Sequence, residues 1–272
     1  MKSQNKVRIL VVGDIVGKGA RNAFINYLPQ LKEKFKYDII VVNAENTTHG
    51  RGLNYKHYCL YQQHHIDVMT MGNHVLDNLE IIKYIDKTTN LIVPGNINYA
   101  ENVLNLHKEC ILTYKNYQIK FINLLEETTM NNEIEMQNPL HYFDNIYQED
   151  LSKNKNYIYI VDYHSEHTLQ KNLMGYYVDG RASLIYGTHT HVQTADERIL
   201  PHKTAYISDV GMCGSFHSII GYDVNSYIKK VKENTPTRVS LNEPFMINGL
   251  FVEIDLESKE ALSILRINEK IM

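Results

Sequence analysis

Two histidines two positions apart, His189 and His191, are the residues whose type and spacing point most directly to chemistry. In an extended backbone the side chains at positions i and i+2 point to the same face, so both imidazoles could reach one small volume. Each imidazole could offer a neutral ring nitrogen to a metal ion. A pair of hydrogen-bonded surface histidines is the ordinary alternative, because short motifs often match by chance. The groups that follow other apolar runs decide between the two.

Polar groups that bind metals or move protons follow five apolar runs of the chain. They are Asp14 after 7–13, Glu45 and Asn46 after 39–42, Asn73 and His74 after 66–71, His164 after 157–163, and His189 and His191 after 182–186. Short apolar runs rich in β-branched residues are typical of buried strands. In open α/β sheets, sites form outside the carboxyl ends of the strands. A cap, a turn or a solvated side chain would explain each residue alone, but five strand ends together favour one shared site.

Helical patterns between these runs indicate how the groups are positioned. Helices are expected over 54–65, 79–85, 140–151, 166–174 and 224–232, and over 20–36, where Pro29 predicts a kink or a division into two pieces. Three strand–loop–helix units in succession predict a mainly parallel α/β sheet. A hairpin is expected from 110–114 and 118–124, and the strands 204–208, 245–254 and 261–267 are expected to be antiparallel because no helices separate them. The polar stretch 126–138 is the expected mobile loop.

The composition is that of a soluble globular protein with a sizeable core: 272 residues, 43% of them hydrophobic and 22% charged. We find no repeat or linker and expect one domain over 1–272. A net charge of −3 gives no general attraction to nucleic acid or anionic lipid, so neither stable nucleic-acid binding nor membrane association is expected. Three scattered cysteines without a Cys-x-x-Cys pair, and no apolar stretch as long as a membrane span, favour a reducing, cytoplasmic location.

The polar groups that follow the five apolar runs, taken in chain order, resemble the motifs of the calcineurin-like metallophosphoesterases. The resemblance extends over nearly the whole chain. The segments 13–17, 43–46, 71–74, 162–164 and 187–196, with Gly-Asn-His at 72–74 and Gly-Thr-His-Thr-His at 187–191, resemble the bacterial YmdB-like branch more narrowly. The resemblance implies a four-layer α/β/β/α sandwich with mixed sheets and phosphodiesterase activity on cyclic nucleotides. The sequence departs from the broad superfamily at Val16, where a histidine is usual, and at Glu45, where a bridging aspartate is usual. In the YmdB-like branch an asparagine replaces the missing histidine, and Asn46 matches it.

The resemblance also implies two metal ions that share Glu45. The implied ligands are Asp14, Glu45, Asn46 and His191 for one ion, and Glu45, Asn73, His164 and His189 for the other. Carboxylate, amide and imidazole groups without a thiolate suit Fe, Mn or Zn better than a structural zinc site or a soft metal. Two divalent or trivalent ions are therefore expected, with Fe or Mn preferred to Zn. Because only two ligands are carboxylates, the pair stays cationic and attracts a phosphodiester.

A two-metal site predicts attack by a bridging water whose pKa the ions lower, while they clamp the phosphoryl oxygens in line. The departing alkoxide needs a proton, and His74 lies beside an implied ligand without a metal of its own. His74 is therefore the candidate general acid, or a group that stabilises developing charge. The alternative is that His74 only orients Asn73. The expected substrate is a small phosphodiester, a 2′,3′-cyclic or 3′,5′-cyclic nucleotide, and the resemblance suggests a homo-oligomer.

Other functions stay open at the level of sequence. A phosphomonoesterase or 5′-nucleotidase could use the same site, and a regulatory RNA-binding protein could keep the fold without turnover, although the full ligand set argues against the latter. A dinucleotide-binding turn at Gly13, Gly17 and Gly19 is weakly supported, because no Tyr-x-x-x-Lys pair accompanies it. Candidate phosphate contacts are Arg21, Arg51 and Arg181, candidate acceptors behind the ligands are Asp162 and Asp196, and His49 lies in the glycine-rich loop after Asn46.

Overall fold

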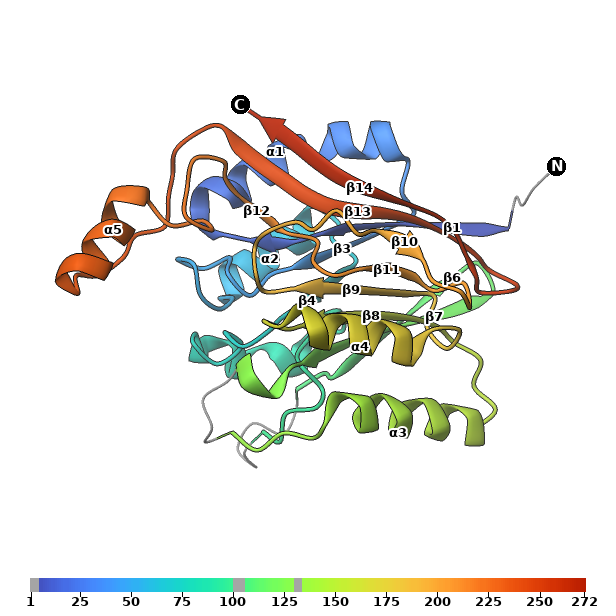
Figure 1. Ribbon diagram of the computed structural model, residues 1–272. Coiled ribbons are helices and arrows are strands. Elements are labelled where there is room, and N and C mark those ends of the chain that lie inside the picture. The colour runs from blue at the N-terminus through green and yellow to red at the C-terminus, as the bar shows by residue number, and fades with distance from the viewer. Residues whose placement is uncertain (1–4, 100–105, 130–133) are drawn as a thin grey trace.

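The computed structural model describes residues 5–99, 106–129 and 134–272. Two β-sheets lie face to face, and helices cover their outer faces (Figure 1). The first sheet is built from the N-terminal and C-terminal parts of the chain, and the second from the middle part. The two ends of the sequence must therefore meet before the first sheet is complete.

The first sheet is parallel in one half and antiparallel in the other. Its parallel half consists of β1 (Lys6–Val12), β3 (Ile39–Asn43), β4 (Val68–Thr70) and β5 (Leu91–Ile92). On the other side of β1 lie β13 (Phe245–Asp255), which is antiparallel to β1, and then β14 (Ala261–Ile271), β12 (Met212–Ser215) and β2 (Asp14–Ile15). The three strands expected over 7–13, 39–42 and 66–71 are confirmed as parallel neighbours.

The second sheet has the order β10 (Arg198–Ile199), β11 (Ala205–Ile207), β9 (Leu184–Thr188), β8 (Ile158–His164), β7 (Tyr117–Leu125) and β6 (Glu109–Tyr114). The hairpin expected from 110–114 and 118–124 is confirmed, with Lys115 in the left-handed region at its turn (φ 53°). The expectation that 204–208 is antiparallel is wrong for its pairing with β9, which is parallel. The loop after β9 and the edge strand β10, which is antiparallel to β11, return the chain to the amino end of the sheet. The parallel connection from β9 to β11 therefore needs no helix.

The α-helices of the described residues are α1 (Gly17–Phe35), α2 (Tyr55–Gln63), α3 (Pro139–Ser152), α4 (Thr168–Val178) and α5 (Val224–Glu233). Helix α1 includes Pro29, so the predicted division into two pieces is wrong; a proline removes one backbone donor and the flanking turns persist. The helix expected over 79–85 is instead two short 3₁₀ segments, η1 (Leu79–Lys83) and η2 (Ile85–Lys87). Of the expected loop 126–138, residues 127–129 form η4 (Glu127–Thr129), and 130–133 lie outside the described residues.

Three buried clusters separate four layers. The cluster outside the first sheet packs Phe24 and Leu31 of α1 against Leu10 of β1. The cluster between the sheets is made of apolar side chains from both, such as Val11, Ile160, Ile207 and Val252. The cluster outside the second sheet contains Phe143 of α3, Met174 of α4 and Val161 of β8. The α/β/β/α sandwich with mixed sheets is therefore confirmed.

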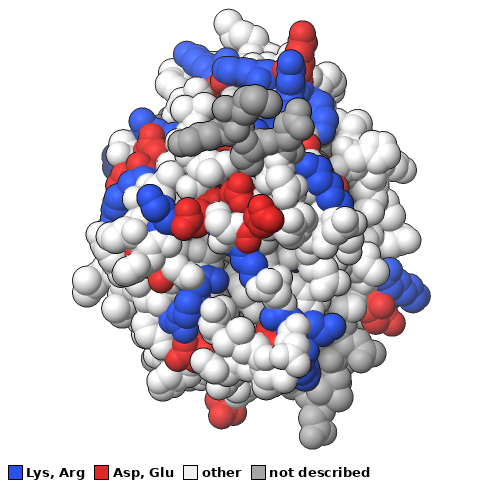
Figure 2. All heavy atoms as spheres, turned by 90° about the vertical axis from the view of Figure 1, so that its right-hand side faces the viewer, with Lys and Arg blue, Asp and Glu red and all other residues white. Residues whose placement is uncertain are grey.

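Charges of both signs are interspersed on the face of the molecule that carries the amino ends of the central strands (Figure 2). A mixed face of this kind gives no extended positive field for a nucleic-acid backbone. Among the described helices, none combines the length and the apolar character that crossing a membrane requires.

Candidate metal centre

The predicted site residues come together where carboxyl ends of strands from both sheets meet. From the first sheet come Asp14 in β2, Glu45 and Asn46 after β3, and Asn73 and His74 after β4; from the second come His164 at the end of β8, and His189 and His191 after β9. All of these residues are buried or partly buried. They form two contact groups, which we call the Glu45 group and the Asp14 group.

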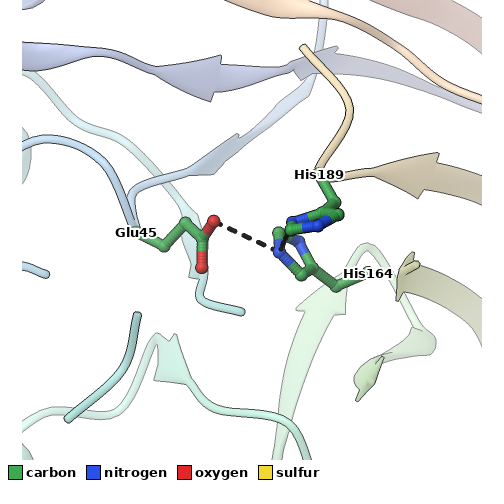
Figure 3. A group of neighbouring side chains, drawn as sticks. All are labelled: Glu45, His164 and His189. Carbon is green, nitrogen blue, oxygen red and sulfur yellow. Dashed lines mark hydrogen bonds and ion pairs between the residues drawn. The ribbon is translucent and has the colours of Figure 1, made fainter. Parts of the chain in front are cut away.

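The Glu45 group is centred on the Nε2 atom of His164. This nitrogen lies 3.2 Å from Oε1 of Glu45, 2.9 Å from Oδ1 of Asn73 and 3.0 Å from Nδ1 of His189. Figure 3 shows the carboxylate of Glu45 directed at the two imidazoles, whose rings meet edge to face. Possible ligand atoms of Glu45, His164 and His189 all lie within 4.8 Å of one another, which is the spacing that one shared cation requires.

The Asp14 group is centred on Nε2 of His191. This nitrogen lies 3.2 Å from Oδ1 of Asn46 and 3.9 Å from Oδ1 of Asp14. The amide nitrogen of Asn46 donates to the carbonyl of Gly50 (3.0 Å), which fixes the amide so that its oxygen faces His191. The backbone N–H of His189 contacts the other oxygen of Asp14 (3.4 Å), so the two groups are adjacent.

Hydrogen bonds on the outer side of His164 select its tautomer. The hydroxyl of Thr188 donates to Asp162 (2.7 Å), so the contact between this hydroxyl and Nδ1 of His164 (2.9 Å) must be donated by the imidazole. Nδ1 therefore carries a proton, and the neutral ring presents a lone pair on Nε2 to the Glu45 group. Asp162 thus acts behind His164 through Thr188, as the sequence had suggested for one of two aspartates.

The other two imidazoles are oriented in the same way by different partners. Nδ1 of His191 lies 2.9 Å from the carbonyl of Ile220, which can only accept, so Nε2 holds the lone pair. Nε2 of His189 lies 3.0 Å from a carboxylate oxygen of Glu166, so Nδ1 holds the lone pair. In all three rings the nitrogen that faces the centre is the unprotonated one of the neutral form. Such outer partners are typical of metal-binding histidines.

A cation reconciles contacts that hydrogen bonds alone leave unsatisfied. The lone pair of His191 faces two oxygen atoms, and Oδ1 of Asp14 is buried with no hydrogen-bond partner among the described residues. A buried polar atom without a partner costs about 1–3 kcal/mol. The donor set of carboxylate, amide oxygen and imidazole suits Mn, Fe or Zn. The residues present therefore fit a metal centre.

The electrostatics of the ligand residues point the same way. Burial alone would lower the pKa of His164, but the Glu45 carboxylate outweighs it and raises that pKa to about 9. Burial raises the pKa of Asp14, and it lowers the pKa of His189 to about 3, helped by the neighbouring charge of His164. The pocket thus favours one positive charge between its carboxylates and disfavours a proton on His189. A metal ion supplies such a charge without occupying the ring nitrogens with protons.

Gly72 allows the Glu45 group to close. A Cβ atom at this position would lie 2.4 Å from Oε2 of Glu45 and 2.5 Å from the ring of His164, closer than real side chains approach. Any larger residue would have to displace a carboxylate or an imidazole of the centre. The Gly-Asn-His motif therefore needs its glycine for space.

His74 follows the Glu45 group without joining it. Its backbone N–H donates to Oε2 of Glu45 (3.1 Å), and its Nδ1 lies 2.9 Å from a carboxylate oxygen of Asp77. Arg51 approaches the same carboxylate at 3.6 Å. Asp77 was missed by the sequence analysis, although its place three residues after His74 in a turn could have suggested it. The imidazole of His74 is thus held at one nitrogen.

The His-x-His segment does not lie on one face of a strand, so that part of the expectation is wrong. Strand β9 ends at Thr188, and His189 and His191 both adopt positive φ values (98° and 63°), which L-residues rarely adopt. Between them, Thr190 donates its N–H (3.2 Å) and its hydroxyl (2.7 Å) to one oxygen of Asp209. The buried amine of Lys171 contacts that oxygen at 2.6 Å. A strained turn, clamped at its middle residue, directs the two imidazoles to different groups.

Several secondary candidates lie elsewhere. Arg181 binds Asp144 on the outer helical layer, and Arg21 is buried and donates to the carbonyl of Thr47, so neither prediction of a phosphate contact is supported. Asp196 accepts from Thr194 and Ser208 and is not in contact with a candidate ligand. Besides Asp77, the sequence analysis missed Glu166 and Asp209, which act across loops that local patterns do not connect.

An α/β/β/α sandwich that gathers carboxylate, amide and imidazole groups at strand ends of both sheets defines a metallophosphoesterase. Comparisons with known proteins narrow this class. The family model described as "YmdB-like protein" matches residues 10–267, and the chain belongs to this YmdB-like family.

Individual relatives cover nearly the full chain. A Bacillus subtilis protein named 2′,3′-cyclic-nucleotide 2′-phosphodiesterase is 40% identical over 265 residues, which are 96% of each chain. The crystal structure of a phosphatase from Mycoplasma pneumoniae superposes with a TM-score of 0.90 at 34% identity, covering 98% of this chain and 95% of that one. A hypothetical protein from Thermus thermophilus gives a TM-score of 0.86 at 26% identity, covering 98% and 100%. The fold and the family are therefore those expected for a chain with this set of candidate metal ligands.

Proposed function

We propose that the chain, a metal-dependent phosphoric diester hydrolase, acts on cyclic nucleotides and prefers 2′,3′-cyclic nucleotides among them. The observation that carries the proposal is the common orientation of three imidazoles. His164, His189 and His191 each engage an outer partner, so that their inner nitrogens face carboxylate and amide oxygens. The Bacillus subtilis relative, whose name states a 2′,3′-cyclic nucleotide as substrate, supports the choice of substrate class.

Two ions fit the two contact groups. One would be held by Asp14, Asn46 and His191, the other by Asn73, His164 and His189, with Glu45 shared between them. Fe or Mn is the preferred metal, and Zn is the next choice on ligand chemistry. When bound, such a pair lowers the pKa of water and withdraws charge from phosphoryl oxygens.

His74 is proposed as the general acid. Because its Nδ1 is held by the carboxylate of Asp77, Nε2 is the nitrogen that can deliver a proton to the leaving oxygen. The backbone contact between His74 and Glu45 keeps the imidazole beside the Glu45 group. This arrangement suits a diester, whose alkoxide leaving group needs protonation.

A substrate panel tests the proposal. Purified protein loaded with Mn²⁺ or Fe²⁺ is assayed on 2′,3′-cyclic AMP, 3′,5′-cyclic AMP, AMP, bis-p-nitrophenyl phosphate and a short RNA, and its metal content is measured. We expect two ions per chain and the highest kcat/KM on the 2′,3′-cyclic diester. Preference for AMP would instead assign a monoesterase or 5′-nucleotidase. Protein with neither metal nor turnover would refute the enzymatic proposal in favour of a binding role.

A further inference from the structure

A cavity of about 440 Å³ lies beside the candidate metal centre and is lined by none of its proposed ligands. We call it the Arg51–Lys230 cavity. Its lining residues are His49, Arg51, Tyr222, Lys230, Asn234, Thr235, Pro236, Thr237 and Val239. One wall comes from the loop after β3 and the other from α5 and the segments on either side of it. Figure 1 shows α5 standing out from the body of the molecule.

Both walls are continuous with residues that orient the Asp14 group. The loop residue between His49 and Arg51 is Gly50, whose carbonyl accepts from the amide of Asn46 (3.0 Å). On the other wall, the carbonyl of Ile220, two residues before Tyr222, accepts from His191 (2.9 Å). A molecule in the cavity therefore adjoins a substrate at the centre.

The cavity carries positive charge. Arg51 and Lys230 line it together with the titratable His49, and none of its described lining residues is Asp or Glu. The ion pair between Arg51 and Asp77 is long (3.6 Å), and the Arg51 side chain is 59% exposed, so its charge stays available to a ligand. A cationic hollow without carboxylates attracts phosphate, and such contacts are the main source of affinity for nucleic-acid backbones.

An aromatic ring accompanies the charges. Tyr222 is partly buried, and its ring centre lies 5.5 Å from that of Tyr227 on α5. Aromatic rings next to basic side chains are the usual means of binding a nucleotide without reading its sequence. The cavity therefore combines the two features that a phosphate with its attached nucleoside requires.

We propose that the Arg51–Lys230 cavity binds a second phosphate of the substrate, so that the enzyme prefers RNA fragments ending in a 2′,3′-cyclic phosphate over cyclic mononucleotides. This inference rests on the proposed function, since the first phosphate occupies the metal centre. A cyclic mononucleotide has only one phosphate and leaves the cavity's charges unused. The second phosphate can be an internucleotide diester or a 5′-phosphate.

Three substrates distinguish an internucleotide diester from a 5′-phosphate as the second phosphate. We compare kcat/KM for adenosine 2′,3′-cyclic phosphate, its 5′-phosphorylated form and the dinucleotide ApA with a terminal 2′,3′-cyclic phosphate. The variant is Lys230→Ala, because Arg51 also touches Asp77 and would disturb His74. Its matched control is Lys229→Ala, which removes an adjacent lysine of α5 that does not line the cavity. Equal salt concentrations are needed throughout, because phosphate contacts weaken with salt.

We expect the wild type to favour a substrate with a second phosphate. Lys230→Ala should lower this preference about fivefold, through KM, since one exposed charge contact is worth about 1 kcal/mol. Lys229→Ala should keep it. A preference confined to the dinucleotide identifies the internucleotide diester, and one shared with the 5′-phosphorylated mononucleotide identifies a phosphate monoester. No preference in the wild type, or the same loss in both variants, would overturn the proposal.

A binding measurement keeps this test separate from that of the proposed function. The Mn²⁺-loaded protein is titrated with ApAp, a dinucleotide that ends in a 3′-phosphate and has no cyclic phosphate. Its binding can therefore be measured without hydrolysis of a cyclic diester. If no cyclic phosphate is hydrolysed at all, the proposed function fails, and the cavity is still tested. Weaker binding of ApAp to Lys230→Ala than to Lys229→Ala supports the cavity, and equal binding contradicts it.

Discussion

Each histidine of the candidate centre is fixed by a different kind of partner: a hydroxyl for His164, a carboxylate for His189 and a backbone carbonyl for His191. The rings therefore hold their orientation without the metal. A preorganised ligand set loses little conformational entropy when it binds an ion. The cost is a group of polar atoms that face one another unsatisfied, as at Asp14.

Replacing one of these rings should remove one ion and leave the other. We expect His191→Ala to bind one ion per chain in place of two, because His191 belongs only to the Asp14 group. Metal analysis of the dialysed protein measures this stoichiometry. His141→Ala, which removes an exposed histidine of α3, should keep both ions. Retention of two ions by His191→Ala would contradict the proposed assignment of ligands.

His74→Ala should keep its full metal content and lose kcat by about 10²–10⁴, the range typical of a general acid. The loss should be much smaller with bis-p-nitrophenyl phosphate, because p-nitrophenolate leaves without protonation. The comparison of the two substrates measures proton donation itself. A variant that turns over cyclic nucleotides like the wild type would limit His74 to the orientation of Asn73.

At the scale of elements, strand ends deliver the ligands, but the loop after β9 sets their directions. His189 and His191 both have positive φ, a conformation that costs about 1–2 kcal/mol per residue. The bonds from Thr190 to Asp209 compensate this strain, and Lys171 neutralises the buried carboxylate. The turn is therefore held by Asp209, two residues after the end of β11, and by Lys171 of α4.

Asp209→Asn should loosen this turn. We expect metal affinity to fall about 10–100-fold, as for other groups that orient metal ligands. Stability should fall by about 3 kcal/mol, because Lys171 is left buried without its counter-ion. Competition with a chelator measures the affinity, and thermal unfolding of the metal-free protein measures the stability.

Asp196→Asn is the matched control for this change. Asp196 also accepts from Thr194 and Ser208 near the same loop, but it does not touch Thr190. It should lose stability without losing metal affinity. If both variants lose affinity equally, the effect belongs to general loosening and not to the clamp at Thr190.

The elements also show how far the sequence alone could lead. The strand ends that carry Asp14, Glu45 and His164 were predictable, because short apolar runs and the residues after them are local patterns. The turn at His189 and His191 was not, because its positive φ values depend on Asp209. Nor was the insertion of β13 beside β1, since strand pairing over such a separation leaves no local pattern.

For the whole molecule, metal binding and folding should be linked. The candidate ligands come from both sheets and converge only in the folded state. A metal ion would therefore bind the folded protein and not the unfolded chain. At a concentration one hundred times Kd, each site adds about 2.7 kcal/mol to the free energy of unfolding. In a protein of this size that raises Tm by roughly 5–10 °C for each site.

Unfolding scans with Mn²⁺ and after removal of metal by EDTA measure this shift. We expect the chelated protein to refold and to regain its higher Tm when Mn²⁺ is returned. His191→Ala should show about half of the shift. An equal Tm with and without metal would argue that the centre binds ions too weakly to matter for stability.

The position of β13 sets an order of events during synthesis. Strand β1 is made first, yet one of its edges stays unpaired until residues 245–255 leave the ribosome. An open edge of an apolar strand invites pairing with other chains. A message that ends before this point would yield a chain with an unfinished sheet, which chaperones or proteases would recognise. The edge of β1 thus stays protected only in a chain that carries residues 245–255.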